Sequence, residues 1–192
     1  KLKEALISYE KALSLEPSNV VILQNIGVVF HLQGNVKESL DYYIKALSID
    51  PNFENIYYNV AALLTVYTAN NPNPKILEII SILIDKKTLI RPRDIMFLTI
   101  NLLKKDSNLK KNLRNQYNIN SNFLAEEVIS ELSEQTLLIK IMKKCPITDL
   151  DIENLLTKLR AKILFSLIEV ENSNKYYKFQ TALAMQCFMN DY

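Results

Sequence analysis

The sequence is short of the residues on which most enzyme sites depend. It has 192 residues with only two glycines, one histidine and two cysteines, and it has no tryptophan. A sheet protein or a phosphate-loop enzyme would need more glycine for its turns, so the scarcity favours helices. GxGxxG, Walker and HExxH sequences are all absent. The single histidine, His31, has no cysteine or acidic residue at catalytic spacing, and we expect it to lie in the groove or on the surface rather than to act as a ligand.

The two cysteines do not suggest a disulfide framework or a zinc site. Cys145 and Cys187 lie 42 residues apart, without a CxxC pair or neighbouring histidines. Because Cys187 adjoins Phe188 in a segment rich in Ala and Leu, we predict a buried structural thiol there rather than a nucleophile. The sequence therefore predicts no catalytic residue, no metal site and no cofactor within this chain.

Charge gives no reason to expect nucleic acid or an anionic membrane as the partner. The 23 basic and 21 acidic residues leave a formal net charge of +2. The one basic cluster runs from Lys104 to Arg114 with only Tyr117 near it for stacking, and we predict a solvated face. The acidic pairs Glu126/Glu127 and Asp149/Asp151 are predicted to start helices or face solvent. The most apolar stretch, residues 76–84, is about half as long as a membrane span requires, and we expect a cytoplasmic protein.

A 34-residue repeat dominates the first third of the chain. Five positions recur at this spacing: Ala5, Tyr9, Ala12, Leu13 and Pro17 correspond to Ser39, Tyr43, Ala46, Leu47 and Pro51. Each copy predicts an amphipathic helix that ends at a proline turn. Small residues at Gly27 and Ala61 allow paired helices to approach closely, and Gly34 suits a tight turn with positive φ.

These positions resemble the tetratricopeptide repeat. The resemblance implies an all-α solenoid of helical hairpins over residues 1–70, continuing into a non-repeat helical bundle over residues 71–192. The second repeat is complete, the first keeps only its second helix, and the third keeps only its first. The expected helix 75–87 has Ile and Leu where the family has small residues, so we expect it to pack differently. Since the chain starts in mid-pattern without Met, we expect a piece of a longer protein.

In this family the first helices of the pairs line a groove that binds peptides or proteins. Asn25 and Asn59 lie 34 residues apart, each just before a core-facing position. An amide side chain can donate to and accept from an extended peptide backbone, and the sequences QNIG and YNVA resemble the asparagine ladder of O-linked N-acetylglucosamine transferases. The alternative is that both Asn residues are simply solvated. We predict six peptide-binding residues: Asn25, Asn59, Gln24, Tyr58, Val28 and Ala62. Because neighbouring positions supply no Lys or Arg, we do not expect a clamp for a carboxyl terminus.

The second half predicts further helices without the repeat. We expect helices over 122–132, up to Lys143, over 150–167, and over 176–190. The expected helix over 150–167 has Leu155, Leu156, Leu159, Ile163 and Leu167 on one face. Thr148 is predicted to cap its amino end.

The carboxyl-terminal part resembles the helical segment that precedes the catalytic domain in bacterial repeat-containing methyltransferases. The matching residues in its last stretch are Ala182, Leu183, Ala184, Gln186, Cys187, Phe188, Asn190 and Tyr192. The resemblance implies that this chain recruits a protein substrate for an S-adenosylmethionine-dependent domain beyond Tyr192. Two alternatives stay open: a stand-alone adaptor, and the recruiting region of another transferase such as a glycosyltransferase.

Overall fold

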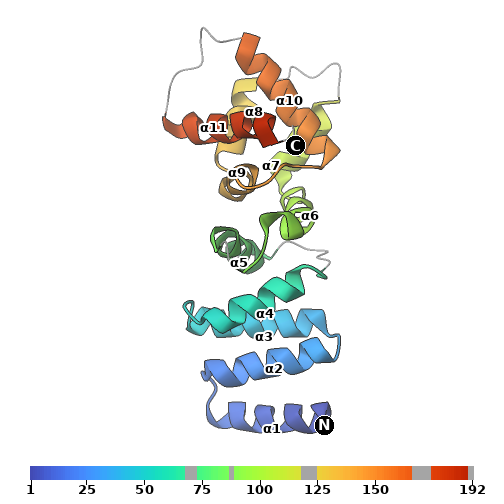
Figure 1. Cartoon of the computed structure of the whole chain (residues 1–192), viewed down its shortest axis with the longest axis vertical. Helices are drawn as coiled ribbons and strands as arrows, with labels where there is room; N and C mark the ends of the chain where they lie inside the picture. Colours follow the sequence, from blue (N-terminus) through green and yellow to red (C-terminus); the bar gives the residue numbers. More distant parts are fainter. Residues whose placement is uncertain (68–72, 87–88, 118–124, 166–173, 190–192) are drawn as a thin grey trace. The chain divides into compact units, whose positions relative to one another are not determined.

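The protein is all-α. The computed structural model describes residues 1–67, 73–86, 89–117, 125–165 and 174–189, and within these ranges it has eleven helices and no strand (Figure 1). The helical fold predicted from the sequence is confirmed. The chain divides into two compact units: unit 1 is residues 1–69 with 86–90, and unit 2 is residues 70–85 with 91–192.

Unit 1 holds the repeat helices α1 (Leu2–Leu15), α2 (Val20–Leu32), α3 (Val36–Ile49) and α4 (Glu54–Leu64). Helix α2 begins at a cap in which Asn19 Oδ1 accepts hydrogen bonds from the backbone amides of Val21 and Ile22 at 3.0 and 3.1 Å. The predicted turn between α2 and α3 contains Gly34 with φ of 79°. Because a side chain rarely adopts that angle, glycine is the residue that lets α3 fold back along α2.

Helices α2 and α3 approach closely at Gly27 and Tyr43. A Cβ atom built at Gly27 would lie 2.5 Å from Cε1 and 2.8 Å from Cδ1 of the Tyr43 ring, which is fully buried. The Ser39 hydroxyl donates a hydrogen bond of 2.7 Å to the Gly27 carbonyl. Only a residue without a side chain lets the ring lie against the α2 backbone, as the small-residue prediction required.

Unit 2 holds the helices that follow the repeats. They are α5 (Pro74–Asp85), α6 (Pro92–Leu103), α7 (Ser107–Asn115), α8 (Ala125–Ser133), α9 (Thr136–Met142), α10 (Leu150–Phe165) and α11 (Asn174–Met189). Helix α5, expected to depart from the repeat packing, contacts α6 and α9. Lys140 on α9 donates to the Ser81 carbonyl at 3.1 Å and pairs with Asp85 at 2.7 Å, which fixes α9 to the end of α5.

Two predictions about α10 and α11 need correction. The cap of α10 is Asp149 and not Thr148, because Asp149 Oδ1 accepts the Ile152 amide at 3.1 Å while Thr148 is exposed. The helix expected to start at residue 122 is α8, described from Ala125, and residues 122–124 lie outside the described part. Leu167, assigned to the apolar face of α10, also lies outside it.

The second correction concerns α11. Cys187 is exposed, so the prediction of a buried thiol is wrong. The buried stripe of α11 passes through Phe179, Ala182, Leu183 and Gln186, and Cys187 lies one residue past it, beyond the core face. Cys145 is the buried thiol, and burial raises its pKa to about 11.

Gln186 has a structural role in this unit. Its Nε2 donates to the carbonyls of Met142 and Cys145 at 2.6 and 2.9 Å, and its Oε1 accepts the Ile147 amide at 2.9 Å. This side chain therefore provides hydrogen-bond partners for backbone groups at the end of α9 and in the segment that follows it, which have no partner within the helix.

Candidate peptide-binding face

Helices α2 and α4 each bury one stripe and expose the opposite one. Ile26 and Val60, the residues that follow the two asparagines, are both fully buried. This phase was predicted from the repeat, and the structure confirms it. Helix α2 contacts α1, α3 and α4. Asn25 on α2 and Asn59 on α4 occupy equivalent positions of successive repeat units, and each immediately precedes a fully buried residue.

Asn25 and Asn59 are half-buried, and their amides form no hydrogen bond with another residue in the described part of the chain. Both side chains therefore keep a donor and an acceptor for another molecule or for water. By contrast, the Asn19 side chain caps α2, and the Asn112 side chain donates a hydrogen bond to Glu131. The described hydrogen-bond network of the fold thus does not involve the side chains of Asn25 and Asn59.

Large apolar side chains surround the asparagines. Val21 is 50% exposed, Leu32 65%, Tyr58 54% and Val66 62%. We call the following residues the α2–α4 face: Val21, Gln24, Asn25, Val28, Leu32, Asn55, Tyr58, Asn59, Ala62 and Val66. It includes the six residues predicted from the sequence, of which Tyr58 and Ala62 are exposed and the other four are half-buried. The other four residues of the face are not among the six predicted, although the same helical phase points to them: Val21, Leu32, Asn55 and Val66.

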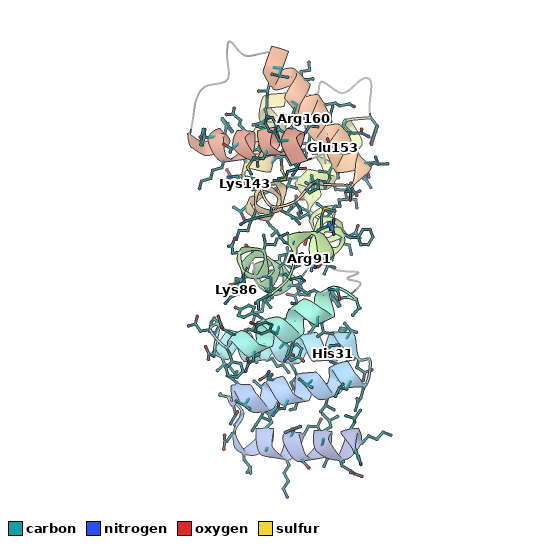
Figure 2. The ribbon with its side chains drawn as sticks, viewed as in Figure 1. His31, Lys86, Arg91, Lys143, Glu153 and Arg160 are labelled. Carbon is teal, nitrogen blue, oxygen red and sulfur yellow. The ribbon has the colours of Figure 1, made fainter. Side chains whose placement is uncertain are left out.

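The face has almost no charge. Helix α2 contains no Lys, Arg, Asp or Glu, and α4 contains only Glu54 at its first residue. Glu54 pairs with Lys86 at 3.1 Å, and the Lys86 ammonium also lies 5.1 Å from the centre of the Tyr57 ring. His31 lies in the last turn of α2, partly exposed (Figure 2). Hydrogen bonds and apolar contacts are therefore the interactions that this surface offers.

Several charged residues of unit 2 form ion pairs within that unit. The basic cluster predicted to lie on a solvated face is exposed at Lys105, Lys110, Lys111 and Arg114. Lys104 differs, because it is half-buried and pairs with Asp149 at 3.0 Å and with Asp151 at 2.7 Å. The Tyr117 hydroxyl donates a hydrogen bond of 3.0 Å to Asp151, so this tyrosine makes a contact within unit 2. The hydrogen bond from Lys104, with a smaller contribution from Tyr117, lowers the pKa of Asp151. The two acids thus join the end of α6 to the start of α10.

A second ion pair lies along α10, where Arg160 Nη2 and Glu153 Oε1 are 2.5 Å apart (Figure 2). The same guanidinium nitrogen donates to Thr157 at 2.7 Å. Among the residues that the structure describes, no group of three His, Cys, Asp or Glu side chains is placed to hold a metal ion. No described helix has the length and apolar character needed to cross a membrane.

Comparison with known proteins supports the repeat alone. Residues 20–53, which form α2, the turn and α3, match the tetratricopeptide repeat family. No curated protein and no solved structure matches the chain. Repeats of this family form protein-interaction scaffolds, and the helical fold of unit 1 agrees with that role.

Proposed function

We propose that this chain is a noncatalytic scaffold that binds an extended segment of a partner protein on the α2–α4 face. The observation that carries the proposal is the pair Asn25 and Asn59, on equivalent turns of successive repeat units and without hydrogen bonds of their own. Each amide can hold one peptide unit of an extended backbone. Gln24, Val28, Tyr58 and Ala62 then contact the side chains of the bound segment.

The test is selection of random linear peptides on the purified chain, followed by titration of an enriched peptide. Asn25→Ala with Asn59→Ala should weaken its binding about tenfold or more, because each variant removes a hydrogen bond worth about 0.5–1.5 kcal/mol. The matched control is Asn35→Ala with Asn52→Ala, two exposed loop asparagines outside the face. Equal loss in both double variants, or no loss in either, would refute the proposed site.

We further propose that in a longer protein this scaffold recruits substrate for a methyltransferase domain. The resemblance of residues 137–192 to the segment that precedes such domains supports this step. In the described part of that segment, Gln186 organises the fold and offers no group to a cofactor. We expect this chain to show no saturable binding of S-adenosylmethionine by calorimetry, and binding would refute the noncatalytic assignment.

The gene sequence that follows Tyr192 separates this proposal from its alternatives. A strand, a glycine-rich turn and then an acidic residue would indicate a nucleotide-cofactor domain. A glycosyltransferase sequence would favour the recruiting role for that enzyme, and a stop codon would favour a stand-alone adaptor. The peptide-binding role of the α2–α4 face is common to all three.

A further inference from the structure

The chemistry of the α2–α4 face restricts what kind of segment it can hold. Its four large exposed side chains, Val21, Leu32, Tyr58 and Val66, are apolar or, for tyrosine, apolar over most of the ring. Four amides lie among them, at Gln24, Asn25, Asn55 and Asn59. An amide side chain can bind a peptide backbone whatever the sequence of the peptide. Any preference for a particular peptide sequence must therefore come from the apolar side chains of the face and from its lack of charge.

A charged side chain would find no partner on this face. Helix α2 has no acidic residue, Lys or Arg, and the one acid of α4, Glu54, is already paired with Lys86 at 3.1 Å. A ligand carboxylate or ammonium seated between the exposed apolar groups would lose hydration without gaining an opposite charge. Apolar ligand side chains would instead cover Val21, Tyr58 and their neighbours.

We infer that the α2–α4 face selects an uncharged extended segment of a partner protein with apolar side chains. This inference rests on the proposed function, since it assigns a specificity to the same face. It excludes acidic or basic peptides and a free carboxyl terminus as the preferred ligands. Binding should also depend weakly on salt, because no charge pair forms.

The experiment uses the peptides enriched from the random linear library on the intact chain. We expect Asp, Glu, Lys and Arg to be depleted and apolar residues enriched, relative to the unselected library. For a synthetic enriched peptide, Kd should change less than about twofold between about 0.05 and 0.5 M NaCl. Enriched peptides that are rich in charge, or a Kd that rises about tenfold with salt, would overturn the inference.

A charged variant gives the matching gain-of-function test. Ala62 is exposed on α4, so Ala62→Lys should fold and should shift the selection toward acidic peptides. Ala161→Lys, the same change at an exposed position of α10, should leave the selection unchanged. An Ala62→Lys variant that enriches the same peptides as the natural chain would also overturn the inference.

The proposed function and the inferred specificity can be refuted separately. If Asn25→Ala with Asn59→Ala abolishes binding but the enriched peptides are charged, the specificity is wrong and the proposed function stands. If the double variant binds as well as the natural chain, or if no peptide is enriched, both the proposed function and the inferred specificity are wrong.

Discussion

Gly27→Ala tests whether the Gly27–Tyr43 contact sets the spacing of the central hairpin. In a helix interior, alanine is favoured over glycine by about 1 kcal/mol. Here, however, the new Cβ would lie 2.5 and 2.8 Å from two carbons of a ring that is fully buried. Overpacking of this kind costs about 1–3 kcal/mol. Since two atoms of the buried ring are affected, we expect the steric cost to exceed the gain in helix preference and unit 1 to lose up to about 2 kcal/mol.

The same substitution should have the opposite sign when the ring is absent. In a Tyr43→Leu background the flexible, smaller side chain can withdraw, so Gly27→Ala should recover the helix preference and stabilise unit 1 by about 0.5–1 kcal/mol. Tyr43→Leu itself should destabilise the unit, and it therefore serves as the reference state for the second measurement.

Amide hydrogen exchange of α2 and α3 measures both effects in unit 1 without interference from unit 2. Exchange in α2 and α3 should accelerate for Gly27→Ala alone. It should slow when Gly27→Ala is added to Tyr43→Leu. Stabilisation by Gly27→Ala in the natural background, or equal effects in the two backgrounds, would show that the ring contact does not limit the hairpin.

Three further predictions concern unit 2. Gln186→Leu should lower the free energy of unfolding of the unit, measured in urea, by about 2–4 kcal/mol, because buried backbone groups lose their hydrogen-bond partner. Gln180→Leu, at a partly buried position of the same helix, should cost under about 1 kcal/mol. Similar losses in the two variants would contradict the network assigned to Gln186. A thiol reagent at neutral pH should modify Cys187 rapidly and Cys145 only after unfolding, because Cys145 is buried and its pKa is raised to about 11. Fast labelling of both thiols would contradict the assigned burial of Cys145. Because the folded pKa of Asp151 is lowered, its contribution to stability is present above its unfolded pKa and is lost as pH falls through the folded value. Asp151→Asn should therefore flatten the acid side of the stability profile, and an unchanged profile would argue against that linkage.

Local signals in the sequence were enough to predict the helical fold and the first hairpin. The 34-residue spacing, Gly34 at the turn and the small residue Gly27 each act through neighbours along the chain or one repeat away. The face followed from the same periodicity, because the burial of Ile26 fixes which way Asn25 points. The QNIG pattern covers only one turn of α2, so it does not indicate Leu32, which lies two turns further along the same side of the helix.

The features of unit 2 depend on contacts between distant residues. The Lys104 ammonium binds Asp149 and Asp151, which lie 45 and 47 residues away in the sequence, so nothing near Lys104 in the sequence distinguishes it from the exposed residues of the basic cluster. The burial of α11 depends on which neighbours pack against it, and neighbouring Ala and Leu residues alone gave the wrong face for Cys187. Without a repeat, no spacing in the sequence indicates such pairings.

The side-chain amide signals of Asn25 and Asn59 provide the most direct test of peptide binding on the α2–α4 face. In a titration of the isotope-labelled chain with an enriched peptide, both NH₂ signals should shift in a saturable way with the same Kd as the binding curve. The signals of Asn35 and Asn52, which lie outside the face, should stay in place. Saturable binding that shifts the control signals, while Asn25 and Asn59 remain unchanged, would contradict the account.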